Sequence, residues 1–507
     1  MLIADLVTTS TVVAATRSRK AKVAALAATL GTAGATELPI VVAYLAGSLL
    51  QRRTGLGWRG LQALPDPADS SSLTVTEVHE TFEQLSALAG SGSQAARSAA
   101  VVSLFGRATE VEQQWLRGLV TGELRQGALD ALVQEALAAA AGVPVRAVRR
   151  AAMLSGSTVA VARTAFDGEA ALAAIGLEVG RPVLPMLASS ATDVAAAFAK
   201  IAPDDSPVAV DTKLDGIRIQ VHRSGDDVVI ATRSLDDITH RLPEVVALAR
   251  SLPATSFVLD GEALALDDDG RPRPFQETAS RTAQAPSGVG ASVAVTAYFF
   301  DLLHLDGRDL LDAPGEERLA ALTGLVPEES LVARLVTDDP VEAEAFAREV
   351  VAAGHEGVVV KSLAATYDAG RRGAGWIKVK PVHTLDLVVL AVEWGSGRRQ
   401  GWLSNIHLGA RDPSSASGFV MLGKTFKGMT DQMLAWQTER FLGLETHREG
   451  HVVHVRPEQV VEIALDGLQR STRYPGGLAL RFARVVRYRD DKRAGEADTV
   501  ETVRLLL

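Results

Sequence analysis

The residue best suited to covalent chemistry is Lys213, in the segment Val210-Asp-Thr-Lys-Leu-Asp-Gly-Ile-Arg218. The chain contains 10 lysines and 42 arginines, so most of its positive charge sits on a group that cannot lose its proton. A lysine with a lowered pKa can act as a neutral amine nucleophile, which arginine cannot do. Asp215 and Gly216 predict a turn that tolerates close approach of a phosphate, and Arg218 offers a forked donor to phosphate or ribose oxygens. A lone lysine of this kind is more often structural, so the interpretation depends on its neighbours.

Two carboxylates flank short predicted strands. Glu262 follows the apolar run at 257–259, and Glu356 precedes the run at 357–360. Carboxylate oxygens at strand ends can hold a divalent ion, and magnesium on a nucleotide phosphate is the commonest such pairing. Each acid taken singly is more often a hydrated turn residue.

Two further lysines alternate along a predicted strand, Trp376-Ile-Lys-Val-Lys380, which places Lys378 and Lys380 on one face. Two ammonium groups on one face repel each other unless an anion lies between them, and they lower the pKa of a neighbouring lysine. Phe300 offers an aromatic face on which a base could stack, and core packing is an equally good explanation for it.

The 507-residue length indicates about three domains. Residues 1–178 show helical periodicity and Ala-rich stretches. Beyond residue 180 come short β-branched runs typical of strands, with a helix at 243–250, and residues after 383 combine strands with a helix at 430–441. We therefore predict a multidomain α+β fold with boundaries near 178 and 382.

Composition limits the class of protein. The net charge of −9 argues against indiscriminate polyanion binding, although residues 470–493 contain eight Lys or Arg against two acids. The lack of cysteine excludes disulfides, thiolate catalysis and Cys-ligated zinc, and it fits a reducing compartment. The longest apolar run is shorter than the about 20 residues that span a bilayer, and the N-terminus lacks the marks of a signal peptide. We expect a cytoplasmic protein without a membrane segment.

Seven motifs in order resemble those of covalent nucleotidyltransferases, and among them the ATP-dependent DNA ligases of the bacterial, actinobacterial-like ligase B type. The likeness spans nearly the whole chain, and although one K-x-D-G segment is a weak signal, seven ordered motifs are a strong one. The motifs are Lys213-x-Asp-Gly-x-Arg218, Thr232-Arg-Ser234, Asp260-Gly-Glu262, Tyr298-x-Phe-Asp-Leu-Leu303, Glu356-Gly-Val-Val-Val-Lys361, Trp376-Ile-Lys-Val-Lys380 and Arg489-Asp-Asp-Lys492.

The resemblance implies an all-helical DNA-binding domain (1–178), an α+β adenylation domain (179–382) and a C-terminal OB-fold β-barrel (383–507). It implies sealing of 3′-hydroxyl/5′-phosphate nicks in duplex DNA, in replication, repair or recombination, through a lysyl-AMP and a DNA-adenylate. ATP would be the co-substrate and Mg²⁺ or Mn²⁺ the cofactor. The protein would be a monomer associated with nucleoid DNA.

The resemblance also assigns roles to single residues. Lys213 would be the nucleophile and Glu262 and Glu356 would hold the metal, Glu262 also serving the ribose. Asp211 and Phe300 would contact adenine, Arg218 and Arg233 the ribose and phosphate, and Arg372 the nucleotide or the nick. Lys378 and Lys380 would neutralise the phosphates, and Lys424 and Arg487 would contact DNA. The residues that would orient pyrophosphate for departure are Arg489, Asp491 and Lys492.

Two other functions share part of these features. An RNA ligase or a capping-type nucleotidyltransferase uses the same lysyl-nucleotide chemistry, but the helical N-terminal third argues for a module that binds a duplex. The second alternative is a non-catalytic DNA-binding relative, and the presence of every reactive lysine argues against it.

Overall fold

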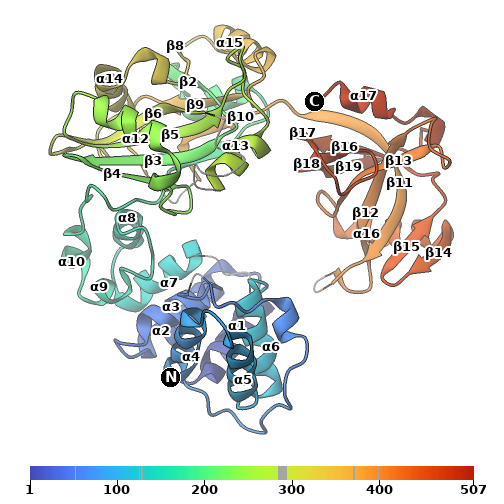
Figure 1. Ribbon diagram of the computed structural model, residues 1–507, viewed down its shortest axis with the longest axis horizontal. Helices are drawn as coiled ribbons and strands as arrows, with labels where there is room; N and C mark the ends of the chain where they lie inside the picture. Colours follow the sequence, from blue (N-terminus) through green and yellow to red (C-terminus); the bar gives the residue numbers. More distant parts are fainter. Residues whose placement is uncertain are drawn as a thin grey trace. The chain divides into compact units, whose positions relative to one another are not determined.

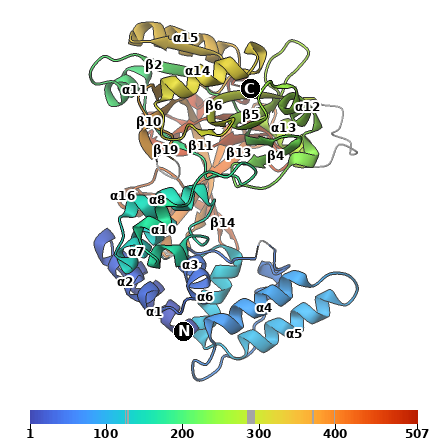
Figure 2. The same ribbon diagram turned by 90° about the vertical axis from the view of Figure 1, so that its left-hand side faces the viewer.

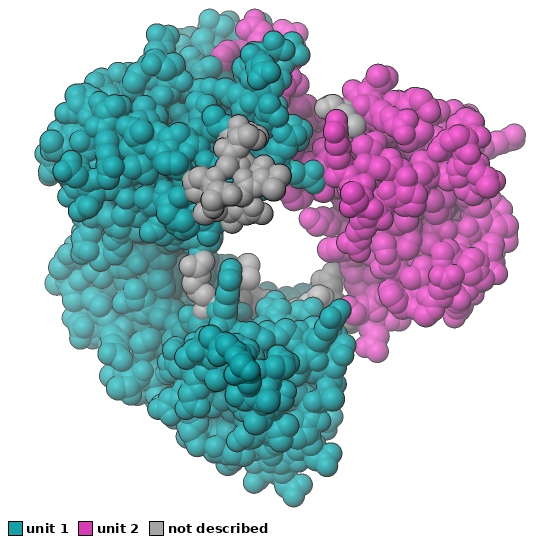
Figure 3. Space-filling model, in the orientation of Figure 1, with its two compact units in different colours: residues 1–190, 197–343, 359–377 teal, residues 191–196, 344–358, 378–507 magenta. Residues whose placement is uncertain are grey.

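The structure is a computed structural model that describes residues 1–51, 53–124, 126, 130–283, 294–368, 372–396 and 399–506 (Figure 1). Contacts divide the chain into two compact units, coloured separately in Figure 3. The first unit comprises residues 1–190, 197–343 and 359–377, and the second comprises residues 191–196, 344–358 and 378–507.

The first unit begins with helices, as predicted. These are α1 (Ile3–Ala15), α2 (Arg19–Thr32), α3 (Leu38–Leu45), η1 (Trp58–Leu61), α4 (Val75–Ala87), α5 (Ser93–Phe105), α6 (Glu110–Thr121), α7 (Asp130–Ala141), α8 (Val145–Leu154), α9 (Ala162–Phe166) and α10 (Glu169–Ala173).

Local sequence signals explain where several of these helices begin and end. Capping boxes start α4 and α6, where the Thr74 and Thr109 hydroxyls accept from the backbone N–H groups of Glu77 and Glu112. Gly122 ends α6 with a left-handed φ of 69°, a conformation that costs glycine least. Helices α4 and α5 lie side by side (Figure 2). One apolar core, from Ile3 to Leu172, joins all of these helices.

The rest of the first unit and the short segments of the second that interrupt it hold two sheets with their helices. Their elements are β1 (Leu187–Ser190), α11 (Val194–Ile201), β2 (Val208–Thr212), β3 (Ile217–Ser224), β4 (Asp227–Thr232), η2 (Thr239–Arg241), α12 (Pro243–Ser251), β5 (Ser256–Ala265), α13 (Phe275–Ala283), β6 (Val295–Leu305), β7 (Arg308–Asp309), α14 (Gly315–Leu325), η3 (Glu328–Ser330), β8 (Arg334–Thr337), α15 (Pro340–Ala352), β9 (Val358–Ser362) and β10 (Arg372–Val379).

One sheet has the antiparallel order β4-β3-β5-β6-β7, and the other has the order β1-β10-β9-β2-β8. Alternate residues of β3, β5 and β6 face opposite ways, so Ile219, Leu259 and Phe299 pack under α12 and α14. Arg218 and Glu262, directly paired across β3 and β5, lie on the other face. The sheet thus separates an apolar core from a polar surface.

The helical segment packs directly onto this region within the first unit. Met153 and Leu154, at the end of α8, share a core with Val183, Met186 and other apolar residues around the polar face. Arg150 adds a bidentate ion pair to Asp312, with both N···O distances 2.7 Å.

The C-terminal elements are β11 (His383–Trp394), β12 (Leu403–Arg411), β13 (Phe419–Thr425), α16 (Asp431–Gly443), β14 (Glu445–Glu449), β15 (Val452–Val455), β16 (Val460–Leu465), β17 (Gly467–Arg470), β18 (Leu478–Arg481), β19 (Arg484–Tyr488), η5 (Ala494–Glu496) and α17 (Val500–Arg504).

Seven of these strands form an antiparallel sheet, ordered β13-β12-β11-β15-β14, with β16 pairing β11 and β19. They surround one core with α16 and α17. Across the described residues these hydrogen bonds do not close into a ring, so the expected barrel is an open, OB-like sheet. The mixed α+β class is confirmed, and the helix predicted at 430–441 corresponds to α16. None of the helices described is both long and apolar enough to cross a membrane.

A buried ion pair ties β6 to α14. The Arg318 guanidinium donates to both Asp301 oxygens (Nε–Oδ1 2.8 Å, Nη2–Oδ2 3.2 Å), and the two side chains are 3% and 2% exposed. Asp301→Asn leaves Arg318 without a counter-charge, so we expect a loss of about 3–5 kcal/mol in unfolding free energy, measured by urea denaturation.

The matched control is the exposed pair between Arg308 and Glu317, whose side chains are 68% and 39% exposed. Glu317→Gln should cost less than about 1 kcal/mol. Equal effects of the two substitutions would contradict a stabilising role for the buried pair.

Candidate active site

Lys213 follows directly after β2, the strand that carries Asp211. Its side chain is half-buried. The following Gly216 lies against β5, where an added Cβ would come within 2.4 Å of the Ala263 carbonyl oxygen. Only glycine fits this close approach, which explains the Gly of the Lys213 segment by backbone packing.

Glu262 lies inside β5, not after a strand as its sequence suggested, because β5 continues to Ala265. Burial raises the pKa of the Glu262 carboxyl to about 7, against the opposing charges of Lys213 and Arg218. Lys213, Arg218 and Glu262 are therefore neighbours. The carboxyl is poised to change its charge near neutral pH and attracts cations when ionised.

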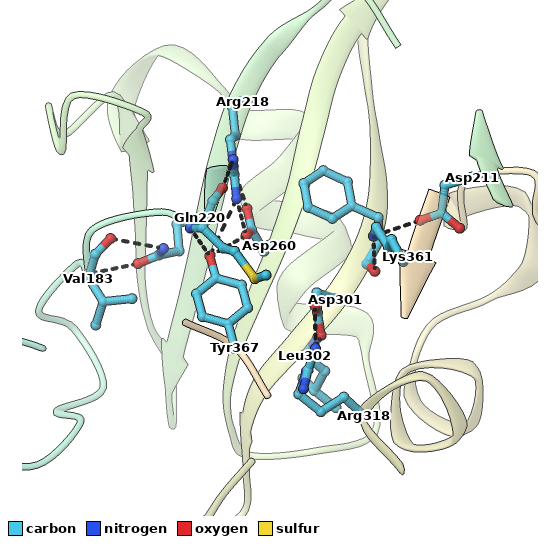
Figure 4. Close-up of polar contacts among 12 residues, drawn as sticks. Val183, Asp211, Arg218, Gln220, Asp260, Asp301, Leu302, Arg318, Lys361 and Tyr367 are labelled. Carbon is cyan, nitrogen blue, oxygen red and sulfur yellow. Dashed lines mark hydrogen bonds and ion pairs between the residues drawn. The ribbon is translucent and has the colours of Figure 1, made fainter. Parts of the chain in front are cut away.

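Arg218 is held in a buried network, drawn in Figure 4. It donates to Asp260 (Nε–Oδ1 3.0 Å, Nη2–Oδ2 2.6 Å), to the Met186 carbonyl oxygen (2.7 Å) and to the Tyr367 hydroxyl (3.4 Å). The Tyr367 hydroxyl donates to Asp260 at 2.6 Å. A guanidinium has five N–H donors, so these four bonds leave one for a ligand. The predicted ribose or phosphate contact stays a prediction.

Asp211 is also enclosed by cations. Arg334 donates to both of its oxygens (2.5 and 2.8 Å), and the Lys361 ammonium lies 2.7 Å from Oδ2. These partners lower the Asp211 pKa against the effect of burial. The strand that carries this carboxylate lies between β8 and β9. Figure 4 shows the contact of Asp211 with Lys361, and the predicted role of Asp211 towards adenine is untested.

Phe300 occupies a β-bulge. The pairing of β5 with β6 passes from Asp260–Asp301 to Gly261–Phe299, so Phe300 has no partner on β5. A bulge re-aims the side chain of the extra residue. The Phe300 ring meets the edge of Trp376 at 5.9 Å between centroids, and the Lys361 ammonium lies 4.6 Å from its centroid. The half-buried ring serves packing here, and base stacking stays a prediction.

Arg233 and Arg372 are the remaining predicted nucleotide contacts of this region. Arg233 is exposed in the turn after β4, where the Leu235 N–H donates to the Thr232 carbonyl oxygen at 2.9 Å. Arg372 begins β10, and its side chain lies outside the part of the chain that the structure describes.

Glu356, Lys378 and Lys380 belong to the second unit. Lys380 is ion-paired with Glu356 and lies 3.7 Å from Asp466. Acids of the same unit therefore neutralise Lys380, for which the sequence had suggested a bound anion. Glu262 and Glu356 lie in different units, so their joint role in metal binding is untested.

The C-terminal motif is assembled around Asp386. Arg489 donates to Asp386 Oδ2 (3.0 Å) and Asp491 Oδ2 (2.6 Å), and the Lys492 ammonium reaches Asp386 Oδ2 at 2.6 Å. A surface depression of about 310 Å³ is lined by Arg489, Lys492, Trp436, Arg440, Glu458, Gln459 and Asp490. The structure thus brings all three predicted motif residues together.

The predicted DNA contacts are ion-paired as well. Lys424 pairs with Glu393, and Arg487 donates to Glu462 at 2.7 Å while 62% of its side chain is exposed. The basic stretch at 470–493 is therefore partly neutralised by acids on neighbouring strands.

No role was predicted from the sequence for several residues of these networks, although Lys361 and Asp260 stand in its motifs. The others are Arg334, Tyr367 and, in the second unit, Asp386. Lys361 carried a signal, because a lysine that ends a β-branched run must bury its charge and find an acid. Arg334 and Tyr367 carried none, since their partners lie 123 and 107 residues away.

Three regions of the chain match family models. Residues 61–138 match the DNA ligase N terminus, residues 185–380 the ATP dependent DNA ligase domain, and residues 399–492 the ATP dependent DNA ligase C terminal region. The chain is 72% identical to a probable DNA ligase of Nocardioides sp., with 100% of this chain and 99% of that protein covered. It is 65% identical to a probable DNA ligase of Beutenbergia cavernae, with the same coverage.

A solved structure named Pmar-Lig_PreS3 shares the fold at a TM-score of 0.62 and 16% identity, over 96% of this chain and 99% of that one. Fold, site and relatives together define an enzyme of the ligase class. The chain belongs to the ATP-dependent DNA ligase family. The predicted activity class is confirmed, with ATP and DNA as substrates.

The raised pKa of Glu262 predicts a pH-dependent stability. The folded state holds the proton up to about pH 7 while the unfolded carboxyl releases it near 4.5, so stability falls as the pH rises between these values. Glu262→Gln removes this loss. We expect the variant to be more stable than the parent by about 3 kcal/mol at pH 8 and by about 1 kcal/mol at pH 5.5.

Thermal unfolding at both pH values measures this difference, with the exposed Glu329→Gln as the control. A difference between Glu262→Gln and the parent that does not change with pH would show that the carboxyl titrates normally.

Proposed function

We propose that this ligase seals 3′-hydroxyl/5′-phosphate nicks in duplex DNA with Lys213 as the nucleophile. The observation that carries the proposal is the position of Lys213. It lies directly after β2, and its charge acts on the buried Glu262 carboxyl and opposes the rise of the Glu262 pKa.

In the first step the neutral Lys213 Nζ attacks the α-phosphorus of ATP. A P–N bond forms, the bond to pyrophosphate breaks, and the amine loses a proton. A 5′-phosphate oxygen at the nick then attacks the same phosphorus, the P–N bond breaks, and Lys213 takes up a proton and leaves as the amine. Finally the 3′-hydroxyl attacks the 5′-phosphorus, AMP leaves, and the hydroxyl proton is released.

The other site residues orient the nucleotide in this proposal. Asp211 and Phe300 face adenine, while Arg218, Arg233 and Arg372 contact the ribose and phosphates. Lys378 and Lys380 neutralise the phosphates, and Arg489, Asp491 and Lys492 orient pyrophosphate for departure.

Glu262 could hold a hard divalent cation such as Mg²⁺ or Mn²⁺, because its buried carboxyl has lost hydration that the charges of Lys213 and Arg218 do not fully replace. Glu356 is the second proposed ligand and would exchange its partner Lys380 for the metal. When bound, the metal would supply charge stabilisation for the triphosphate.

We further propose that residues 1–178, 179–382 and 383–507 act as the DNA-binding, adenylation and OB-fold domains. The enzyme would work as a monomer in the cytoplasm, on nucleoid DNA.

Replacing the nucleophile tests the proposal. Lys213→Ala and Lys213→Arg should both abolish the covalent AMP adduct, because neither side chain supplies a neutral amine. Intact mass before and after treatment with ATP and magnesium measures the adduct, and peptide mapping locates it.

The control is Lys200→Arg, at an exposed lysine whose ammonium contacts only the Ser190 carbonyl oxygen among its described hydrogen bonds. It should keep the adduct. An adduct in either Lys213 variant, or one mapped to the buried Lys361, would exclude Lys213 as the nucleophile.

DNA contact by Lys424 and Arg487 predicts a change in salt dependence. Lys424→Ala and Arg487→Ala should each weaken binding to nicked DNA and reduce the slope of log K against log salt by about one unit per lost phosphate contact. Fluorescence anisotropy at several salt concentrations measures the slope.

Arg456→Ala is the matched control, since Arg456 is another exposed arginine of this region paired with a glutamate, Glu458. It should leave the slope unchanged. If Arg487→Ala also leaves the slope unchanged, Arg487 faces solvent in the complex.

A further inference from the structure

Three side chains on the β14–β15 hairpin are arranged like the ligands of a metal ion. His447 on β14 lies directly opposite His454 on β15. Glu449 follows His447 by two residues along the same strand, so its side chain emerges on the same face. We call His447, Glu449 and His454 the hairpin site. None of its residues has a part in the proposed ligation chemistry.

The distances within the hairpin site fit a small cation. Nε2 of His447 lies 3.8 Å from Glu449 Oε1, and Nε2 of His454 lies 3.7 Å from Oε2. All three ligand atoms lie within 4.8 Å of one another, and the two imidazole rings are stacked with centroids 4.3 Å apart. An ion bound at about 2.0–2.2 Å from each ligand could bridge these atoms once the stacked imidazole rings rotate so that both Nε2 lone pairs converge on it.

A bulge at Thr446 determines which nitrogen of His447 carries the proton. The register passes from Glu445–Val455 to His447–His454, which leaves Thr446 as the extra residue. Its hydroxyl donates to the His454 carbonyl oxygen at 3.1 Å, and its oxygen lies 3.2 Å from His447 Nδ1. Since the hydroxyl proton is used, the oxygen must accept from Nδ1–H. A neutral His447 therefore presents the lone pair of Nε2.

The Nε2 atom that carries this lone pair lies 3.8 Å from a Glu449 carboxylate oxygen, so a cation between the two acceptors would bind both. Donation of the other ring N–H to a neighbouring oxygen is also how proteins orient metal-binding histidines. The nearby Glu393 cannot serve as the cation's acid, because Asn405, His407 and Lys424 already donate to it. Glu449 is the acid that completes the set.

We propose that the hairpin site binds a late first-row divalent cation of the Zn²⁺ class. Two imidazoles and one carboxylate suit Zn²⁺, whereas Mg²⁺ prefers oxygen ligands alone. The ion would link β14 to β15, and the fourth position of its coordination shell is open to water or an anion. This site is chemically distinct from the proposed magnesium site at Glu262.

Isothermal titration of the full chain with ZnCl₂, in the presence of excess MgCl₂, tests the proposal. We expect one Zn²⁺ per chain at this site, and at least tenfold weaker binding for His447→Gln and for His454→Gln. Glu449→Gln should weaken binding as well, and Thr446→Val should weaken it less, because Thr446 only orients His447.

His240→Gln is the control, since His240 is exposed in the first unit and should leave the titration unchanged. Formation of the AMP adduct by each variant shows that it is folded, and it should persist because the hairpin lies outside the proposed active site. Absence of Zn²⁺ binding by the parent, or equal binding by the His447→Gln/His454→Gln double variant, would overturn the proposal.

Discussion

The site of this ligase depends on buried carboxylates that each require a cation. Asp260, Asp211 and Asp301 are nearly inaccessible to solvent, and an ionised carboxylate without a partner would cost several kcal/mol in such surroundings. Each finds a guanidinium or an ammonium on another strand or helix. These pairs fix the positions of Arg218, Lys361 and Arg318, and through them the register of the strands that hold the site.

The same constraint fixes the side chains of the polar face through contacts within the protein itself. Four of the five N–H donors of Arg218 are used by Asp260, Met186 and Tyr367. The Phe300 ring contacts Trp376 and Lys361. A preorganised site loses little side-chain entropy on binding. Against this rigid frame, Glu262 stands out as a carboxyl whose pKa is raised to about 7 beside Lys213.

In the second unit, charged side chains form ion pairs on an exposed surface. Its arginines and lysines pair with acids on adjacent strands, as Arg487 does with Glu462 and Lys492 with Asp386. The charge of a basic segment in an acidic chain is thus partly balanced by acids of the same unit. The hairpin site differs, because there an exposed acid faces two histidines in place of an arginine or a lysine.

The sequence by itself determined the class of fold, the order of its elements and the residues of the motif series, because periodicity, caps and short motifs are local properties. It placed α12 and α16 almost to the residue and indicated Lys213. Only the tertiary structure decided that Glu262 lies inside β5, that Phe300 is the extra residue of a bulge, and that Asp211 is paired with Lys361 and Arg334. These outcomes depend on partners more than a hundred residues away, or on the register between strands, and no local pattern records either.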